Sequence, residues 1–401
     1  GAPTLHFGTL AREFEERQVR DGAWQNPRTR ITMHARLEGL AELIGGHRPL
    51  DTLTRADFNA LRDQLRGYPK NRHRLRATRY QPLSQIIQGG KYEPIHARTA
   101  KKFFELARAL ISYAHDQGYL KENLAAGLTF STKGASSPRK RTYTSRQIEL
   151  LLNGPIYRLT KPPRWRLDDY RFWLPLLGLY SGARLSELCQ LRLGDIREEL
   201  GVWVISISSS GARQLKTVDS ERLVPLHKVI LEAEFLAFHQ QRLDATDGNL
   251  SATLFENLRV YGDLSPGHTA SRWFRGSDKD DKGYLGQCGL GDDELTYHGL
   301  RHTFIQQFRR QKLDMLIGKA LVGHADRSTT GGYGDCYPSY VLKEELDKID
   351  FETSTTHILY NDYKVLQAQQ GVFRIGRPVG AGTTKTASRP AKRHWQSRIT
   401  R

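Results

Sequence analysis

The sequence lacks the features that mark membrane proteins, disulfide-rich secreted proteins and metalloenzymes. It has three cysteines in 401 residues, too scattered for a disulfide framework or a CxxC zinc knuckle. It has no run of about 18 apolar residues, no signal peptide and no lipidation motif. It has no HExxH motif and no carboxylate cluster with metal-ligand spacing, which disfavours a metal-dependent nuclease. We therefore expect a soluble cytoplasmic protein that uses neither a metal nor another cofactor.

Acidic residues are too few to balance the basic ones. The chain has 61 lysines and arginines against 43 aspartates and glutamates, which gives a net charge of +18 and a pI near 9.8. So large an excess favours a polyanionic partner over a small metabolite, and nucleic acid is the first candidate. A chain of this length is long enough for two domains with full cores and a tail.

The first third of the chain, residues 1–130, has the pattern of a helical domain. Thr54 to Asp57 has the form of a capping box and marks a helix start. A longer helix is predicted from Thr99 to Gln117, with Gly118 as its stop. Its apolar face is formed by Phe103, Leu106, Leu110, Ile111 and Ala114.

Two basic segments contain no acidic residue and are predicted to contact phosphates. The first lies in the helical domain, and its cations are Lys70, Arg72, Arg74, Arg76 and Arg79. The second lies in residues 131–143, whose serine, glycine and proline content is typical of a linker. Its cations are Arg139, Lys140 and Arg141. A charge run is usually only a solvated surface, but the net charge of the chain favours phosphate contact here.

Residues 144–350 form the second predicted domain. Thr144 to Gln147 offers a capping box that restarts regular structure, and helices follow, including the apolar stretch Phe172 to Tyr180. Two strands, Val202 to Ser208 and Arg222 to Leu226, are predicted to form a hairpin before helices resume. The fold class is therefore mainly α with a small antiparallel sheet, an α+β pattern.

The remaining segments have less pattern. Residues 244–293 are rich in glycine, aspartate and serine, and no structure is predicted for them. With them, the segment between the predicted hairpin and His298 is longer than a minimal catalytic domain needs. Residues 351–401 are expected to be a C-terminal extension. Its last 31 residues carry eight lysines or arginines and no acid, which is typical of a mobile basic tail.

Four features of the second domain carry side chains suited to phosphate chemistry, and two come early. A glycine turn places Arg184 at a helix start, with Glu187 one turn later to orient it. Lys216 lies near the tip of the predicted hairpin, where a lysine can give a proton to a leaving oxygen. Alone, the arginine pattern is more often a surface ion pair, and a hairpin lysine is as often simply solvent-facing.

The other two features lie near the end of the domain. His298 and Arg301 are three residues apart near a helix N-terminus, which favours phosphate binding, whereas the adjoining His302 is predicted to be structural. His324 precedes Tyr333 by nine residues across a polar turn. A tyrosine nucleophile needs such neighbours, because forming a phenolate at neutral pH costs about 4 kcal/mol. Taken alone, a tyrosine after a Gly-Gly turn such as Tyr333 is usually an ordinary surface aromatic residue.

The ordered set resembles the tyrosine recombinases of the phage integrase family. The matching motifs are SGARLSEL, LKTVDSERLVPL, YHGLRHTF and VGHADRSTTGGY, and the match covers residues 144–350. The helical N-terminal third resembles the family's core DNA-binding domain in architecture only. The resemblance implies an active site formed by Arg184, Lys216, His298, Arg301, His324 and Tyr333. Asp335 departs from the family pattern, since many relatives have a basic residue there.

Each implied role agrees with the chemistry of its side chain. Two arginines can hold the non-bridging oxygens of a phosphodiester and take the place of metal ions. The resemblance implies that Tyr333 attacks phosphorus to give a 3′-phosphotyrosine link while Lys216 protonates the departing 5′ oxygen. His298 is placed to accept the phenolic proton or to bind phosphate, and His324 to hydrogen-bond a phosphate oxygen. The neighbouring Tyr337 and Tyr340 lack the spacing from His324.

The leading hypothesis is a site-specific recombinase of a bacterial mobile element, an integrase or transposase-like enzyme acting in the cytoplasm on double-stranded DNA. A homo-multimer on DNA is expected, namely a tetramer, with accessory DNA-bending or directionality proteins as further partners. The helix near Leu342 to Ile349 either closes its own domain or docks on a neighbouring subunit. The competing functions are a type IB topoisomerase-like enzyme that relaxes DNA and a catalytically silent architectural DNA-binding protein.

Overall fold

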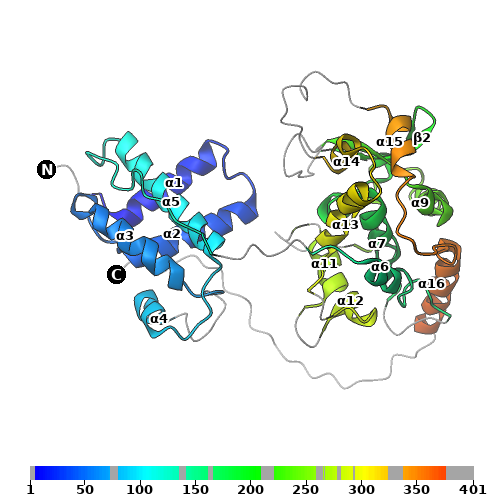
Figure 1. Cartoon of the computed structure of the whole chain (residues 1–401), viewed down its shortest axis with the longest axis horizontal. Helices are drawn as coiled ribbons and strands as arrows, with labels where there is room; N and C mark the ends of the chain where they lie inside the picture. Colours follow the sequence, from blue (N-terminus) through cyan, green and yellow to red (C-terminus); the bar gives the residue numbers. More distant parts are fainter. Residues whose placement is uncertain are drawn as a thin grey trace. The chain divides into compact units, whose positions relative to one another are not determined.

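The computed structural model describes residues 5–72, 80–134, 141–160, 166–208, 221–258, 265, 267–277, 281–291, 294–323 and 337–375, the last five by their backbone alone. The chain divides into two compact units between residues 139 and 140 (Figure 1). Within the described ranges, no helix combines the length and the apolar character that crossing a membrane requires.

The first unit is helical, as predicted. Its helices are α1 (Phe7–Arg20), α2 (Pro27–Ile44), α3 (Arg55–Gln64), α4 (Leu83–Gly89) and α5 (Ala97–Asp116), with the 3-10 turns η1 (Leu50–Thr52) and η2 (Leu65–Gly67). The predicted capping box begins α3, where the backbone N–H of Thr54 donates to Asp57 Oδ2 at 2.7 Å. After α5, Gly118 has a φ of +76°, which lets the chain leave the helix there.

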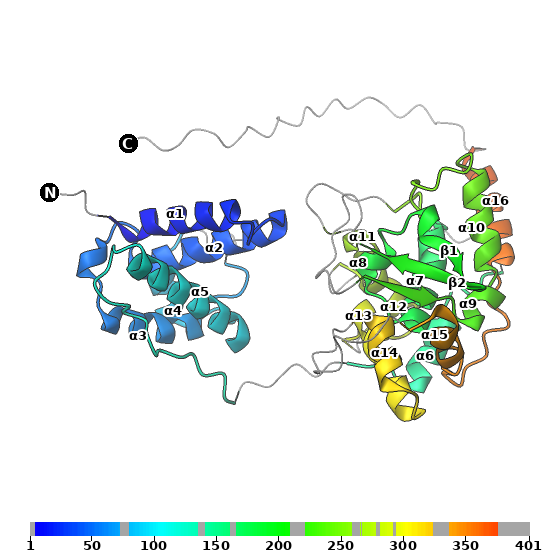
Figure 2. The same ribbon diagram turned by 90° about the horizontal axis from the view of Figure 1, so that it is seen from above.

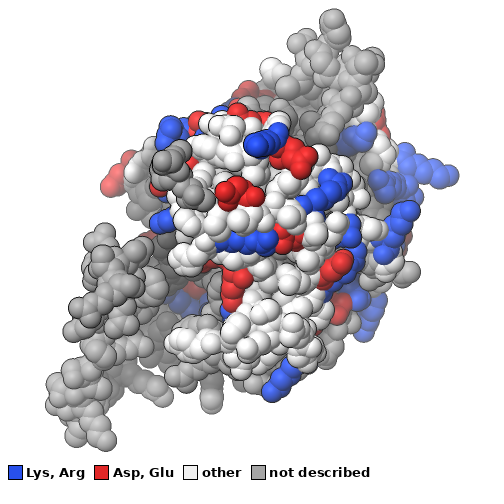
Figure 3. Space-filling model, turned by 90° about the vertical axis from the view of Figure 1, so that its left-hand side faces the viewer, with Lys and Arg blue, Asp and Glu red and all other residues white. Residues whose placement is uncertain are grey.

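The apolar face predicted for α5 is confirmed. Phe103, Leu106, Leu110, Ile111 and Ala114 are all buried in the core of the first unit, and the basic side chains of Lys101, Lys102 and Arg108 are exposed. On the face of this unit seen in Figure 3, acidic and basic side chains are interspersed. That face therefore does not concentrate charge of one sign.

The second unit places a small sheet among helices, which confirms the predicted fold class. Its strands β1 (Ile196–Glu199), β2 (Val202–Ile207) and β3 (Arg222–Pro225) pair antiparallel in that order, with Ile196 opposite Ile205 and Ile207 opposite Arg222. The described helices are α6 (Ser145–Leu152), α7 (Asp169–Ser181), α8 (Leu185–Leu188), α9 (Lys228–Glu232), α10 (Phe235–Asp244), α11 (His268–Arg275), α12 (Gly283–Gln287), α13 (Tyr297–Arg310), α14 (Met315–Val322), α15 (Ser339–Leu346) and α16 (Tyr360–Ile375), with the 3-10 turn η4 (Leu193–Asp195).

Helices α7 and α13 pack side by side at the centre of this unit (Figures 1 and 2). Thr296 caps α13 through the N–H of Gly299, and Leu300, Phe304 and Phe308 form its buried face. At the end of α7, Gly182 adopts a φ of +62°, and a Cβ there would clash with the Phe304 ring. The turn that leads to Arg184 therefore requires glycine.

The core of the second unit includes residues on both sides of the predicted domain, residues 144–350. Tyr143, expected in the linker, is buried in the core of the second unit, and its N–H donates to Thr303 Oγ1 on α13 at 2.7 Å. At the other end, Phe351, Ile358 and Tyr360 belong to the same core, although an extension was expected from residue 351. Apolar side chains at both ends pack against distant helices, which local composition does not reveal.

Two further segments belong to this core. The 244–293 segment, left unassigned from sequence, includes α11 and α12, whose Phe274 and Tyr284 are buried. Helix α15 packs against β2, β3 and α14, and buries Leu342 and Leu346, with Ile349 buried just after its end. Of the two alternatives for this helix, the structure favours closure of its own domain, because the apolar stripe is covered within the chain. Docking of this stripe on a neighbouring subunit is not supported.

Candidate active site

Arg184 is held by the turn that follows α7. It precedes the short helix α8, and its backbone N–H donates to Glu187 Oε2 at 2.7 Å while its Nη1 donates to Glu187 Oε1 at 2.7 Å. The same carboxylate thus fixes both the main chain and the side chain of Arg184. The orienting role predicted for Glu187 agrees with this geometry.

A second arginine, Arg222, binds the same carboxylate. It is the first residue of β3, and its Nη2 donates to Glu187 Oε2 at 2.8 Å. Burial alone would raise the pKa of Glu187, but hydrogen bonds and charge from Arg222, followed by those from Arg184, hold that pKa below its ordinary value. Glu187 is therefore ionised at neutral pH although its side chain is only 3% exposed.

Arg301 lies on the buried side of α13 and bonds to main-chain carbonyls rather than to a carboxylate. Its Nη1 donates to the carbonyl of Gly182 at 2.8 Å, and its Nη2 donates to the carbonyl of Val322 at 2.6 Å. Burial, followed by repulsion from Arg184 and Arg222, lowers the pKa of Arg301 to about 9. The guanidinium remains charged at neutral pH but lies in a strongly positive environment.

These contacts gather three guanidinium groups around one carboxylate. The two arginines predicted for the active site, Arg184 and Arg301, are brought together, since the charge of the first lowers the pKa of the second. With Arg222 and Glu187 included, the cluster carries a net charge of about +2. Such fixed donors in a poorly hydrated site are suited to hold an anion whose charge grows during reaction.

His298 lies in the first turn of α13, one turn before Arg301, and is exposed. Its ring contacts that of His302 edge-on, with 4.5 Å between ring centroids. The exposed position suits a group that exchanges a proton with a bound substrate. His302, predicted to be structural, is half-buried beneath it.

The other three predicted catalytic residues, Lys216, His324 and Tyr333, lie outside the described residues. The elements on either side of the two segments that contain them are described. Strands β2 and β3 pair antiparallel, which confirms the predicted hairpin strands. Lys216 belongs to the connection between them. His324 directly follows Gly323, which ends α14 beside the arginine cluster.

Three of the eight cations predicted to bind DNA are described. Lys70 forms an exposed ion pair with Glu93, at 2.9 Å, and Arg141 pairs with Glu294 on the surface. Arg72 differs, because it is buried and donates to Glu42 Oε1 at 2.7 Å and to the carbonyl of Gln81. This placement favours a structural role for Arg72 over phosphate contact. The others, outside the described residues, are Arg74, Arg76, Arg79, Arg139 and Lys140.

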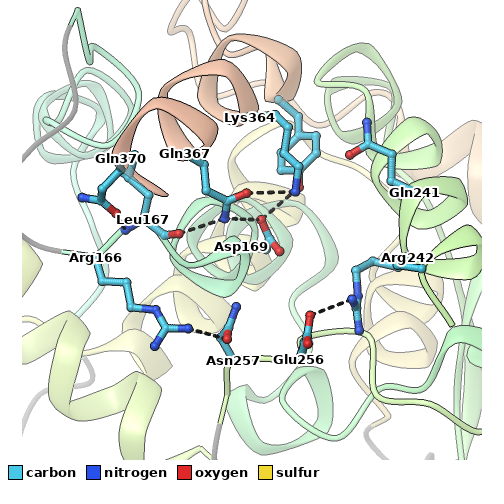
Figure 4. A pocket seen from close by; sticks show the side chains of 12 residues that line it. Arg166, Leu167, Asp169, Gln241, Arg242, Glu256, Asn257, Lys364, Gln367 and Gln370 are labelled. Atoms are coloured by element: carbon cyan, nitrogen blue, oxygen red, sulfur yellow. Dashed lines mark hydrogen bonds and ion pairs between the residues drawn. The ribbon is translucent and has the colours of Figure 1, made fainter. Parts of the chain in front are cut away.

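A cavity of about 480 Å³ in the second unit contains none of the predicted catalytic residues (Figure 4). Its charged walls are already paired, with Arg242 bound to Glu256 and Arg166 bound to Asn257. Among the residues that the structure describes, no group of three histidine, cysteine or acidic side chains is placed to hold a metal ion. The arginine cluster is therefore the site suited to phosphate.

No role was predicted for Arg222, although one signal of its role was present in the sequence. Its side chain is only 6% exposed, and it begins a strand whose later residues Val224 and Pro225 are buried. A charged residue at the start of a buried strand needs a fixed partner. That partner, Glu187, is 35 residues away in sequence, which explains why spacing alone did not find it.

The chain is similar in sequence to a known family and to known proteins. Residues 169–339 match the model of the phage integrase family. The tyrosine recombinase XerA of Pyrococcus horikoshii is 31% identical over 184 residues, which are 45% of this chain and 55% of that protein. The tyrosine recombinase XerD of Proteus mirabilis is 27% identical over 247 residues, 60% of this chain and 69% of that protein. The chain thus spans little more than half the length of the archaeal relative.

Two solved structures share the fold at low identity. A lambda integrase dimer bound to a COC′ core site superposes with a TM-score of 0.50 and 17% identity, covering 83% of this chain and 78% of that one. The Tn1549 transposon integrase with circular intermediate DNA gives a TM-score of 0.52 and 16% identity, covering 85% and 100%. The family match therefore identifies residues 169–339 as a region of the phage integrase family, similar in sequence to tyrosine recombinases, and the solved integrases share the fold of the chain.

Proposed function

We propose that the chain is a site-specific recombinase that cuts and rejoins double-stranded DNA through a covalent 3′-phosphotyrosine intermediate. The observation that carries the proposal is the cluster in which the half-buried Arg184 and the buried Arg301 are fixed while the four charged groups keep a net positive charge. A phosphodiester entering this site would add one negative charge and relieve the repulsion that lowers the pKa of Arg301.

In the proposed reaction, the two arginines hold the non-bridging oxygens of the scissile phosphate. The phenolic oxygen of Tyr333 attacks phosphorus and gives up its proton, with His298 as the acceptor or as a further phosphate ligand. The bond from phosphorus to the 5′ oxygen breaks, and Lys216 supplies the proton that makes this oxygen a hydroxyl. His324 donates to a phosphate oxygen. A 5′ hydroxyl from another strand reverses the step, so neither ATP nor a metal ion is required.

The assembly is proposed by likeness to structural neighbours. Lambda integrase is known as a dimer on a core site and as a tetramer on a Holliday junction, and the Tn1549 protein is a transposon integrase. We infer that this chain also works as a homo-multimer, namely a tetramer, on the ends of a bacterial mobile element in the cytoplasm, with accessory DNA-bending or directionality proteins as partners.

DNA contacts are assigned to cations outside the cluster. Lys70 and Arg141 are exposed in the structure, and Arg141 lies next to α13, because its carbonyl would meet a Cβ placed at Gly299. With the basic residues 74, 76, 79, 139 and 140, they would supply phosphate contacts on double-stranded DNA. Binding should then weaken steeply with salt.

The test uses a nicked duplex that carries the terminus of the element. After incubation without divalent metal and denaturation, the protein should run as a covalent adduct with DNA, and Tyr333→Phe should abolish the adduct. An adduct that persists in Tyr333→Phe would refute the assignment of the nucleophile. A substrate with paired sites separates recombination from relaxation: a topoisomerase-like enzyme would relax supercoils and give no recombinant product.

A further inference from the structure

Arg222 lies where three segments of the site meet. It opens β3, opposite Ile207 at the end of β2, so it closes the hairpin whose connection contains Lys216. Its Nη2 binds Glu187 Oε2 at 2.8 Å, and its Nε donates to the carbonyl of Leu321 at 2.7 Å. One planar guanidinium thus joins the hairpin, the Arg184 turn and the end of α14.

The end of α14 is held by two arginines. The last carbonyls of a helix have no partner within the helix and carry partial negative charge. In α14, the carbonyl of Leu321 accepts from Arg222 and the carbonyl of Val322 accepts from Arg301. The chain therefore leaves α14 toward His324 from a point that both arginines fix.

Gly323 lets the chain pass close to Arg222 at this point. Its φ is +64°, and a Cβ there would lie 3.0 Å from Arg222 Nη1, a contact tighter than side chains ordinarily make. Glycine removes both the conformational cost and the close contact. The residue before His324 is thus fitted to the Arg222 guanidinium.

Glu187 depends on Arg222 more than on Arg184 for its charge. Of the effects that oppose burial and lower the pKa of Glu187, the hydrogen bond and charge of Arg222 are larger than those of Arg184. The charged groups that face this carboxylate in the described structure are Arg184 from the turn, Arg222 from β3 and Arg301 from α13. Without Arg222, the hydrogen bonds of Arg184 would remain to oppose burial, so the pKa of Glu187 should rise and the share of the protonated carboxyl, which holds Arg184 poorly, should grow.

We propose that Arg222 is a positioning residue for the cleavage reaction. It holds Glu187, and through Glu187 it holds Arg184, at a fixed position relative to the end of α14, after which the His324 to Tyr333 segment begins. Its guanidinium is committed to protein groups and acts through them rather than on DNA. The inference rests on the proposed function and adds to it a residue outside the six that the family resemblance implies.

The experiment compares Arg222→Gln and Arg222→Lys with a matched control, Arg242→Gln. Arg242 is also nearly buried in the second unit and binds a carboxylate, Glu256, and a carbonyl, that of Leu254, but it lines the separate cavity of Figure 4. The readouts are DNA affinity at fixed salt, thermal unfolding, and the single-turnover rate of adduct formation on the nicked duplex from pH 6 to pH 9.

Arg222→Gln is expected to bind DNA within about 2-fold of wild type and to form the adduct on the order of 100-fold more slowly at pH 7, since small misplacements of reacting groups have effects of this size. The deficit should shrink as the pH rises, because Glu187 then recovers its charge. Arg222→Lys keeps a cation beside Glu187 but cannot also reach the Leu321 carbonyl. It should show an intermediate deficit that does not change with pH.

A double-mutant cycle tests the route through Glu187. Glu187→Gln combined with Arg222→Gln should be little slower than either single variant, because both remove the same interaction. The inference is overturned if Arg222→Gln cleaves at the wild-type rate, if its deficit is constant with pH, or if Arg242→Gln loses as much activity. If Arg222→Gln fails to fold, Arg222→Lys decides by the same rate comparison. A wild-type protein that forms no adduct would instead refute the proposed function.

Discussion

Replacing Arg301 by methionine separates the electrostatic cost of the arginine cluster from its contribution to cleavage. Methionine is long, flexible and apolar, so it fills most of the space of the arginine side chain without its charge or donors. Alanine would add a cavity and confuse the result. We expect Arg301→Met to remain folded with nearly unchanged stability and to lose at least 100-fold in cleavage rate, since it removes phosphate donors of the transition state.

The expected stability follows from two opposing contributions. The pKa of Arg301 falls from 12.5 to about 9, which corresponds to roughly 5 kcal/mol against the charged form. Its two hydrogen bonds to the carbonyls of Gly182 and Val322 stabilise the fold, by about 1.5–3 kcal/mol each for a charged donor. The two contributions nearly cancel, so the free energy of unfolding should change by less than about 2 kcal/mol.

Urea unfolding followed by tryptophan fluorescence measures this change, because five of the six tryptophans lie after residue 140. Inorganic phosphate added to the wild type should raise the unfolding midpoint, since an anion that binds the native cluster stabilises it. The same addition to Arg301→Met should have a smaller effect. A loss of stability greater than about 4 kcal/mol would refute the reasoning, because it would mean that Arg301 pays no electrostatic penalty in the folded state.

Two further predictions concern α15 and its surroundings. Leu346 is fully buried, so Leu346→Ala should lower the free energy of unfolding, measured in urea, by about 2–5 kcal/mol. Oligomers should still form on DNA. Unchanged stability with loss of oligomers would instead favour docking of α15 on a neighbouring subunit. Burial, partly opposed by Asp347, lowers the pKa of His227 to about 4, so the unfolded chain binds more protons between pH 6.5 and 4. The free energy of unfolding should therefore keep its full value above pH 6.5 with respect to His227 and decrease as the pH falls from 6.5 to 4. A decrease of the same size in His227→Gln would contradict the role of His227.

The features that the sequence predicted correctly are those decided within a few residues. The caps at Thr54 and Thr144 each bond to the residue three positions later, and the apolar face of α5 repeats at helical spacing. Strand β1 was missed, because three of its four residues IREE are charged and its strand structure depends on pairing with β2. Burial of Tyr143 and Arg72 was missed because their partners, Thr303 and Glu42, are distant in sequence.

The choice of partners explains how the cluster keeps its arginines fixed without neutralising them. Arg301 is held by two neutral carbonyls, whereas Arg184 and Arg222 share one carboxylate. Had each arginine its own carboxylate, a phosphate would have to displace ion pairs before binding. Backbone carbonyls fix the position of a guanidinium without neutralising its charge. The N–H donors are then already in place for the negative charge that develops on the phosphate. In the protein without DNA, the pKa of Arg301 is lowered because the guanidinium is buried and lies near two other arginines.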